Sequence, residues 1–268
     1  MLGQPIAHSL SPTLHRAGYE ALGLAWSYDA YEVGAGGLGG FLTGLDDTWR
    51  GLSLTMPLKR EAMTLLDEVD AAGELAGAVN TVVLVDGRVS GANTDVPGAV
   101  AAVREVTDAA FTRAVVLGGG ATASSTGLAL CDLGVRDIDV LVRDPARATE
   151  TLEVIERHPS GPRVGVGMLE DADRLRADIV VSTVPAQAQT AAVLARCAEV
   201  PVVFDVLYHP WPTPLAQAAM GDGRVLVGGL DLLVHQAVLQ FQLFTGRDVP
   251  VAVLRAAGEA ALATRGVE

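Results

Sequence analysis

Small polar side chains, a lysine and a carboxylate lie at the ends of short apolar runs in the first hundred residues. Ser9 and Ser11 flank a leucine near the start, and Lys59 ends a Thr-Met-Pro-Leu-Lys stretch. Asn80 and Asp95 follow later apolar runs. Hydroxyl, amide, amine and carboxylate groups together can hydrogen-bond a small molecule that carries several hydroxyls. The pattern predicts a pocket for a polyol.

Lys59 and Asp95 are the candidate pair for proton transfer. If Pro57 opens a helix, the amine of Lys59 lies at the positive end of the helix dipole, which lowers its pKa toward neutrality. General acid–base catalysis needs such a pKa, and a nearby aspartate would hold the amine in place. The alternatives are a solvated lysine and an aspartate that caps the helix beginning near Pro97. We hypothesise that the two side chains act together.

The two serines predict an anion site without arginine. The segment from Ser11 to Gly23 reads as a helix with Pro12 in its first turn. We expect Ser11 to cap this helix and Ser9 to be free, so that two hydroxyls and a helix start could hold a carboxylate. The alternative is two ordinary capping serines.

A glycine-rich turn follows an apolar run over residues 114–117. It reads Gly118, Gly119, Gly120, Ala121, Thr122, Ala123, with glycine at the first and third positions and alanine at the sixth. Such a turn between a strand and a helix lets backbone N–H groups approach a pyrophosphate. We expect a dinucleotide site here rather than a plain tight turn. A polyol pocket together with a dinucleotide site indicates an alcohol dehydrogenase.

The end of the next strand bears on which nicotinamide cofactor binds. Arg143 and Arg147 lie four residues apart around Asp144-Pro145. Arginines at this place pair with a 2′-phosphate, whereas a carboxylate accepts from ribose hydroxyls. Because Asp144 precedes a proline, helix capping explains it without a ligand. The arginines favour NADP, with NAD possible, and solvated surface arginines are the alternative.

Charge and composition exclude several classes of protein. The formal net charge is −13 with a pI near 4.7, so nucleic acid is not expected as a partner. Cys131 and Cys197 are far apart and lack metal-ligand spacing, so we expect two buried thiols and neither a disulfide nor a zinc site. The histidines are scattered, and we assign no metal. Charge or glycine interrupts every long apolar stretch, so the sequence predicts a soluble, cytoplasmic protein without a membrane span.

The order of elements predicts an α/β protein of two domains. In the first hundred residues we expect strands over 26–33 and 49–54, a helix from Leu58 toward Val69, and a hairpin that turns at Asp86-Gly87. From about Val96, strands alternate with helices as in a doubly wound, Rossmann-type unit. The expected strands cover residues 114–117, 138–142, 164–167, 179–182, 202–206 and 225–227. Two last helices, over about 230–244 and from about 250, could return to the first domain. We assign residues 1–95 plus 230–268 to the substrate domain and residues 96–229 to the nucleotide domain.

Several motifs, taken in order along nearly the whole chain, resemble those of the shikimate dehydrogenase family. They are Pro5-Ile6-Ala7-His8-Ser9-Leu10-Ser11-Pro12, Thr55-Met56-Pro57-Leu58-Lys59, Gly77-Ala78-Val79-Asn80-Thr81, Asn93-Thr94-Asp95, and Gly229-Leu230 through Gln236-Ala237. The resemblance implies that the first domain and the final helices bind shikimate, that the middle domain binds NADP, and that the cleft between them closes over the reaction. It also implies hydride transfer between C4 of the nicotinamide and C3 of the ring, with Lys59 and Asp95 as the catalytic pair.

The resemblance further implies a role for each matching residue. Ser9 and Ser11 would hold the carboxylate. The ring hydroxyls would be bound by Thr55, Lys59, Asn80, Asp95 and Gln236, with Tyr208 near the substrate. By the same resemblance, Thr183, Val206 and Gly229 would join the glycine turn and the two arginines at the cofactor.

Departures from the family pattern keep alternatives open. Ser53 stands where many members have asparagine, and Val142 and Asp144 replace the usual neighbours of Arg143, which leaves the cofactor preference open. The other functions considered are a quinate/shikimate dehydrogenase that uses NAD and a catalytically idle nucleotide-binding sensor. A folate-linked methylene dehydrogenase shares the layout but would not need the serine pair. Retention of Lys59 and Asp95 argues against the sensor. The expected partners are shikimate or 3-dehydroshikimate, and the chain is expected to be a monomer or homodimer.

Overall fold

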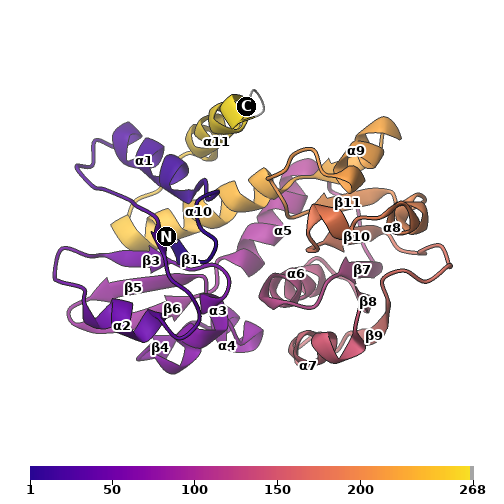
Figure 1. Cartoon of the computed structure of the whole chain (residues 1–268), viewed down its shortest axis with the longest axis horizontal. Coiled ribbons are helices and arrows are strands. Elements are labelled where there is room, and N and C mark those ends of the chain that lie inside the picture. Colours follow the sequence, from indigo (N-terminus) through magenta and orange to yellow (C-terminus); the bar gives the residue numbers. More distant parts are fainter. Residues whose placement is uncertain (266–268) are drawn as a thin grey trace. The chain divides into compact units, whose positions relative to one another are not determined.

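The computed structural model describes residues 1–265 of the 268-residue chain, which divide into two compact units (Figure 1). Unit 1 comprises residues 1–94 and the chain from Leu233 onward, and unit 2 comprises Asp95–Leu232. The second boundary falls inside one helix, α10 (Gly229–Thr245). Each unit has its own sheet, and each is described here by itself.

Unit 1 is built on a mixed sheet with the strand order β3 (Gly51–Ser53), β5 (Thr81–Val85), β6 (Arg88–Ala92), β4 (Glu68–Val69). Strands β5 and β6 form the predicted antiparallel hairpin. Asp86 and Gly87 have φ values of 51° and 75°, which is the geometry of the tight turn that Asp-Gly favours. Strands β1 (Leu2–Gly3) and β2 (Tyr31–Glu32) form a short parallel pair. A single parallel bridge joins Leu2 of this pair to Leu54, the residue after β3.

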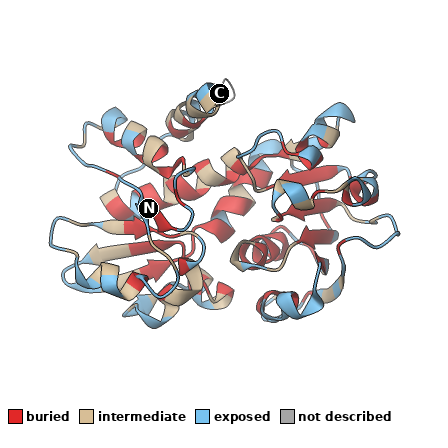
Figure 2. Cartoon of the chain, viewed as in Figure 1, coloured by how far each residue is buried: buried red, intermediate tan, exposed pale blue. Residues whose placement is uncertain are grey.

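Helices of unit 1 come from both ends of the chain. They are α1 (Ser11–Ala21), α2 (Leu38–Thr43), α3 (Leu58–Glu61), α4 (Ala71–Ala76), most of α10, and α11 (Val251–Arg265). A side chain added at Gly18 of α1 would overlap the ring of Phe241 in α10 and approach Leu254 in α11. Helix α1 therefore packs closely on the two C-terminal helices, as the sequence predicted. Buried leucines of the first strands and helices, with Val79 and Val82, form a core cluster of this unit. The buried segments of the chain are red in Figure 2.

Two expectations for unit 1 are wrong. The strand expected over 26–33 pairs only at Tyr31–Glu32, because its partner β1 is two residues long. The helix expected from Leu58 toward Val69 stops after a 3-10 turn at Ala62–Thr64. The chain turns there because Asp67 donates its N–H to the carbonyl of Val89 at 2.8 Å, which leads into β4 beside β6.

Unit 2 confirms the doubly wound prediction. Within residues 95–232 its sheet is parallel, with the strand order β12-β11-β10-β7-β8-β9. The strands are β7 (Arg113–Leu117), β8 (Asp137–Val142), β9 (Arg163–Met168), β10 (Ile179–Ser182), β11 (Val202–Asp205) and β12 (Val225–Val227). The chain order reverses between β7 and β10, which is where such sheets bind nucleotides. Strands β10 and β11 are buried along their full length, as expected of a sheet covered on both faces (Figure 2).

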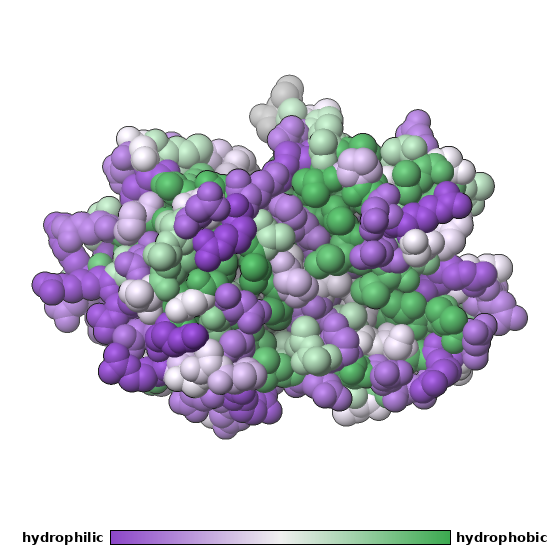
Figure 3. All heavy atoms as spheres, turned by 180° about the vertical axis from the view of Figure 1, so that it is seen from behind, coloured by the Kyte–Doolittle hydropathy of each residue, from purple (hydrophilic) through white to green (hydrophobic). Residues whose placement is uncertain are grey.

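The helices of unit 2 alternate with its strands: α5 (Asp95–Val106), α6 (Ala121–Asp132), α7 (Thr149–Glu156), α8 (Ala191–Cys197) and α9 (Pro214–Gly221). The thiols of Cys131 and Cys197 are buried, as predicted, and burial raises the pKa of both to about 11. Hydrophilic and hydrophobic residues are interspersed on the surface seen from behind (Figure 3). Among the described residues, no helix combines the length and the apolar character that crossing a bilayer requires.

Candidate active site

Asn80 and Gln236 meet in a buried polar cluster of unit 1. They lie 156 residues apart in the sequence, yet Nδ2 of Asn80 donates to Oε1 of Gln236 at 3.2 Å. Asn80 directly precedes β5, and its Oδ1 accepts from the N–H of Thr94 at 2.8 Å. Both amides are nearly inaccessible, with 2% and 6% of their surface exposed. The structure therefore brings together two residues that were predicted to bind ring hydroxyls.

Thr55 and Lys59 are held beside this cluster by the backbone. The carbonyl of Lys59 accepts from Val79, the residue before Asn80, at 2.9 Å. Thr55 donates its N–H to the carbonyl of Leu2 at 2.9 Å. Both side chains are partly exposed, so they can reach a ligand while their main chain stays anchored.

The helix that carries Lys59 is shorter than expected. Helix α3 is four residues long, and Lys59 is its second residue. Because few peptide dipoles are aligned in so short a helix, its field at the amine is weaker than that of the longer helix predicted from sequence. The dipole argument for Lys59 is therefore weaker than the sequence suggested, and its proposed role rests on its position.

The serine pair is arranged differently from the expectation. Leu10 is the N-cap residue of α1, and no side chain caps the helix. Ser11 is the first helical residue, and its N–H approaches Oγ of Ser9 at 3.3 Å. The prediction that Ser11 caps and Ser9 is free is wrong, because the helix begins one residue earlier than a Ser11 cap would require. Both serines still lie at the helix start, where N–H groups favour an anion.

Asp95 is the first residue of α5 and follows Thr94, which is itself bonded to Asn80. Its surface is 6% exposed. Lys59 belongs to unit 1 and Asp95 to unit 2, so the proposed catalytic pair is divided between the two units. The pairing of these two side chains stays a prediction.

The glycine turn of unit 2 has the features that a nucleotide site needs. Gly118 follows β7 with a φ of +113°, which other residues rarely adopt. Gly120 is the N-cap residue of α6 and supplies no side chain. A Cβ added at Gly120 would meet nothing within 4 Å, so there is room for a group close to the backbone at the helix start. These features fit a pyrophosphate on the N-terminus of α6.

Gly119 joins this turn to the segment that carries the two arginines. A Cβ added at Gly119 would come within 2.8 Å of the carbonyl oxygen of Arg147. Oδ1 of Asp144 accepts from the N–H of Ala146 at 3.1 Å, which confirms that this carboxylate caps the short turn after β8. Arg143 and Arg147 are exposed. The structure therefore places both arginines on a segment that touches the glycine turn.

The other predicted cofactor residues lie at the carboxyl ends of neighbouring strands. Oγ1 of Thr183 donates to the carbonyl of Leu117 at 2.9 Å, next to Gly118. A Cβ on Gly229 would come within 2.4 Å of the carbonyl of Val206, so these two residues are in contact. Tyr208 follows two residues after Val206 and is partly buried. Ala121, Thr122 and Ala123 form the first turn of α6.

Asp205, at the end of β11, was not predicted from the sequence. Its carboxylate holds the segment after β11, which carries Val206 and Tyr208. Its Oδ2 accepts from Gln189 at 2.7 Å and from Thr213 at 2.6 Å, and its Oδ1 accepts from the N–H of Leu207 at 3.2 Å. Burial raises the pKa of this carboxyl group, and the hydrogen bonds oppose that shift. The only signal in the sequence was a carboxylate at the end of an apolar strand.

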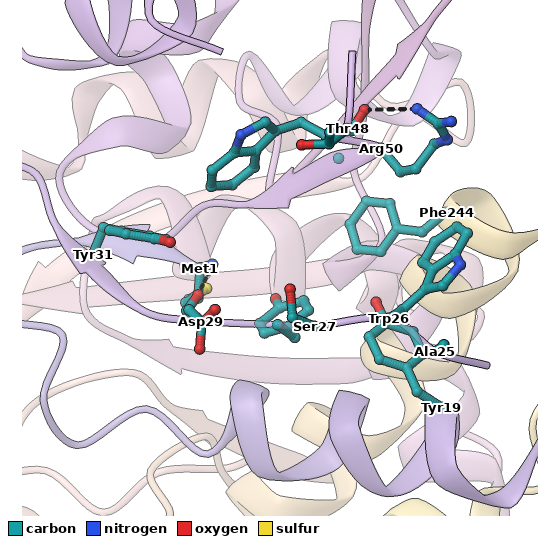
Figure 4. A pocket seen from close by; sticks show the side chains of 13 residues that line it. Met1, Tyr19, Ala25, Trp26, Ser27, Asp29, Tyr31, Thr48, Arg50 and Phe244 are labelled. Carbon is teal, nitrogen blue, oxygen red and sulfur yellow. Dashed lines mark hydrogen bonds between the residues drawn. The ribbon is translucent and has the colours of Figure 1, made fainter. Parts of the chain in front are cut away.

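No cluster of metal-ligating side chains occurs within residues 1–265, and no metal was predicted. One hollow of about 480 Å³ in unit 1 contains none of the predicted site residues (Figure 4). Aromatic side chains line it, including Tyr19, Trp26 and Tyr31, together with the polar groups of Asp29 and Arg50.

Comparison with known proteins places the chain in a family. Residues 1–82 match the family described as "Shikimate dehydrogenase substrate binding domain", and residues 229–257 match "Shikimate 5'-dehydrogenase C-terminal domain". The chain is 35% identical over 269 residues to the shikimate dehydrogenase (NADP(+)) of Methanopyrus kandleri, covering 96% of this chain and 93% of the relative.

Solved structures agree with the sequence relatives. The shikimate dehydrogenase of Mycobacterium tuberculosis is 39% identical with a TM-score of 0.87, covering 97% of each chain. The quinate dehydrogenase of Corynebacterium glutamicum, solved in complex with NAD, is 30% identical with the same TM-score and coverage. Because sequence identity above 30% extends over nearly the whole chain, this protein belongs to the shikimate dehydrogenase family.

Proposed function

We propose that the chain is an NADP-dependent shikimate dehydrogenase that interconverts 3-dehydroshikimate and shikimate on the route to chorismate and the aromatic amino acids. The observation that carries this proposal is the hydrogen bond between Asn80 and Gln236 in unit 1. Two side chains expected at the substrate, from distant parts of the sequence, meet there in one buried cluster. Unit 2 separately provides a glycine turn with space at the start of α6.

In this proposal the two units have separate tasks. Unit 1 binds the ring: Ser9 and Ser11 hold the carboxylate, and Thr55, Asn80 and Gln236 hold hydroxyls, with Tyr208 of unit 2 near the ring. Unit 2 binds the nucleotide through residues 118–123, with Thr183, Val206 and Gly229 at the nicotinamide end. NADPH supplies the hydride when it is bound.

Lys59 handles the proton in this proposal. As the ring carbonyl at C3 is reduced, negative charge develops on its oxygen, and the ammonium of Lys59 donates a proton there. In the oxidation direction the neutral amine takes the proton back. Asp95 orients the amine and stabilises its charged form. Lys59 is the only lysine in the chain, because the other 18 of the 19 basic residues are arginines. Arginine keeps its proton at any ordinary pH, so only Lys59 among them can exchange one.

A second function is supported by one comparison. The quinate dehydrogenase of Corynebacterium glutamicum is as similar in fold as the shikimate enzyme of Mycobacterium tuberculosis, and it was solved with NAD. Asp144 beside Arg143 is compatible with either cofactor in sequence terms. A quinate/shikimate dehydrogenase that uses NAD is therefore the alternative.

One absorbance experiment separates these functions. Formation of the reduced nicotinamide is followed with shikimate and NADP, then with NAD in place of NADP, then with quinate in place of shikimate. We expect the highest kcat/KM with shikimate and NADP. A higher value with quinate and NAD would replace the main proposal with the alternative. No turnover with any combination would support a nucleotide-binding sensor.

Arg143 and Arg147 are expected to cause a preference for NADP over NAD. Replacing Arg147 with alanine leaves the 2′-phosphate with one guanidinium fewer, so KM for NADP should rise about tenfold while KM for NAD stays unchanged. The same contrast is expected for Arg143→Ala. Arg157→Ala, an exposed arginine at the end of α7, is the matched control. Equal changes in KM for NADP and for NAD would show that these arginines do not bind the 2′-phosphate.

We also propose that the enzyme acts in the cytoplasm as a monomer or homodimer. The free, buried thiols of Cys131 and Cys197 support a reducing compartment.

A further inference from the structure

A second layer of buried polar side chains lies behind Asn80 in unit 1, and Gln240 is at its centre. Gln240 is one turn after Gln236 in α10 and is 1% exposed. Its Oε1 accepts from Oγ of Ser53 at 2.8 Å. Its Nε2 donates to the carbonyl of Asn80 at 3.2 Å and to Oγ1 of Thr81 at 3.0 Å. One side chain therefore joins strands β3 and β5 to the last helices.

The orientation of the Gln240 amide is determined by its neighbours. The carbonyl oxygen of Asn80 can only accept a hydrogen bond, so the NH₂ group of Gln240 must face it. Oε1 then faces Ser53 and Nε2 of His15, which approaches at 3.3 Å. The opposite orientation would place two acceptors against each other. Only one of the two orientations of this amide is therefore compatible with its hydrogen-bond partners.

The order of donors continues from Gln240 to the proposed substrate residues. Because Thr81 accepts from Gln240, its own hydroxyl hydrogen is available to Oδ1 of Asn80 at 3.0 Å. Oδ1 of Asn80 also accepts from the N–H of Thr94, and Nδ2 of Asn80 donates to Oγ1 of Thr94 at 2.9 Å and to Oε1 of Gln236 at 3.2 Å. Nε2 of Gln236 in turn donates to the carbonyl of Leu233 at 2.8 Å. Each group in this series donates to the next.

The series begins at the opposite side of the core. The hydroxyl of Tyr28 donates to Oγ of Ser53, which leaves the hydroxyl hydrogen of Ser53 for Gln240. Burial raises the pKa of Tyr28, and it lowers the pKa of His15 to about 3, so both are neutral over the range in which the enzyme would be assayed. Their rings are stacked with centroids 4.2 Å apart. Ser53 is also the position at which this chain departs from the asparagine of many family members.

We propose that Gln240 is a positioning residue for substrate recognition: by donating to the backbone carbonyl of Asn80 and to the hydroxyl of Thr81, it holds the Asn80 and Gln236 amides at the place where they bind the ring hydroxyls. The N–H of Thr94 and the carbonyl of Leu233 set the orientation of these two amides together with it. This inference rests on the proposed function for the identity of the substrate. In this orientation Asn80 presents only its Nδ2 hydrogens to a ligand, because its Oδ1 is turned toward Thr81 and the N–H of Thr94. These hydrogens are directed to Oγ1 of Thr94 at 2.9 Å and to Oε1 of Gln236 at 3.2 Å, so a ligand must share or displace one of these contacts. A ring oxygen that meets Asn80 must therefore accept.

The test is the substitution Gln240→Glu, which keeps the shape of the side chain. While the introduced carboxyl group is protonated, it can still donate to one of its partners. Once ionised it cannot donate, and its charge would draw the Thr81 hydroxyl away from Asn80. Because the site is buried, the pKa of this carboxyl group should lie above the ordinary value of about 4.3. We expect KM for shikimate, relative to wild type, to rise about tenfold as pH increases through that pKa, with KM for NADP unchanged.

Two further variants separate positioning from general damage. Gln240→Met removes the donors without adding a charge, so its KM for shikimate should be raised by the same factor at every pH. Gln242→Glu adds the same charge two residues later at an exposed place on α10 and should match wild type. If Gln240→Glu does not fold, Thr81→Val removes only the relaying hydroxyl and should raise KM for shikimate severalfold. Two results would overturn the proposal. One is a KM for shikimate in Gln240→Glu that, relative to wild type, does not change with pH. The other is an equal change in KM for shikimate and for NADP.

A measurement without substrate keeps this inference distinct from the proposed function. In ¹⁵N-labelled Gln240→Glu protein, the side-chain NH₂ resonances of Asn80 and Gln236 should shift with a common midpoint as the introduced carboxyl group titrates. In wild-type protein and in Gln242→Glu they should not shift with that midpoint. If the NH₂ resonances of Asn80 do not shift as the introduced carboxyl group titrates, Gln240 is not coupled to Asn80 and the proposal is wrong, even if the enzyme is active. Failure of the wild-type protein to oxidise shikimate would instead overturn the proposed function.

Discussion

Lys59→Met should lower kcat by about 10²–10⁴-fold in both directions of the reaction, because the reacting oxygen loses its proton donor and acceptor. The fold should be preserved, since the substitution keeps the backbone carbonyl of residue 59, which binds the N–H of Val79. Steady-state kinetics with shikimate and NADP, together with thermal unfolding, measure both effects. The unfolding midpoint should differ little from that of wild type.

Two companion variants identify what the lysine supplies. Lys59→Arg keeps the positive charge but holds its proton too tightly to exchange it, so kcat should stay low. Arg88→Met removes one positive charge from an exposed hairpin position of the same unit and should leave kcat unchanged. If Lys59→Met raises KM for shikimate and leaves kcat intact, the residue binds substrate and another group transfers the proton.

The single lysine also allows a direct measurement. Reductive methylation with ¹³C-formaldehyde labels only Lys59 and the terminal amine, because the sequence contains no other lysine. The carbon resonance of Lys59 can then be titrated. On the proposed pairing of Asp95 with Lys59, Asp95→Asn should move this titration to lower pH, because loss of a neighbouring carboxylate disfavours the ammonium form. An identical titration in the two proteins would show that Asp95 does not act on the amine.

Gly119→Ala should raise the Kd for NADP by at least about tenfold, while the Kd for shikimate stays unchanged. The added methyl group would lie 2.8 Å from the carbonyl oxygen of Arg147 and 3.2 Å from Cα of Ala148. Both contacts are with backbone, which cannot move aside as a flexible side chain could. The glycine turn and the segment with Arg147 must therefore separate, and both are proposed to hold the nucleotide.

The experiment compares binding of the two ligands. Isothermal titration gives the Kd for NADP and, separately, the Kd for shikimate in the variant and in wild type. Gly221→Ala, at the end of α9 with open space around it, is the control for adding a methyl group to unit 2. A Kd for NADP that equals the wild-type value would mean that the turn does not contact the nucleotide as proposed.

The sequence predicted the parts of this protein that depend on local pattern. Every strand of unit 2 was placed within one residue at each end. Inner strands such as β10 and β11 are covered on both faces, so each is a continuous apolar run that a turn ends. The prediction of a hairpin at Asp86-Gly87 was correct because few residue pairs accept positive φ at both positions. The cap at Asp144 was likewise set by an aspartate followed by proline.

The errors occurred where a distant contact overrides local preference. Leu58, Ala62 and Leu65 have helical spacing, but the chain leaves the helix after Thr64 so that Asp67 can pair with Val89 of β6. The strand expected over 26–33 is short because β1 offers it only two residues to pair with. Neither partner can be recognised from the segment itself.

Sequence alone thus determined which chemistry the chain can carry: a lone amine, a carboxylate, amide and hydroxyl donors, and a glycine turn after a buried strand. Only the tertiary structure decided how those groups are oriented. Gln240 reads from sequence as a polar residue in an apolar helix, and its importance arises because folding brings α10 against β3 and β5. A hydrogen bond has a direction, and that direction is set by partners that lie more than 150 residues away in the chain.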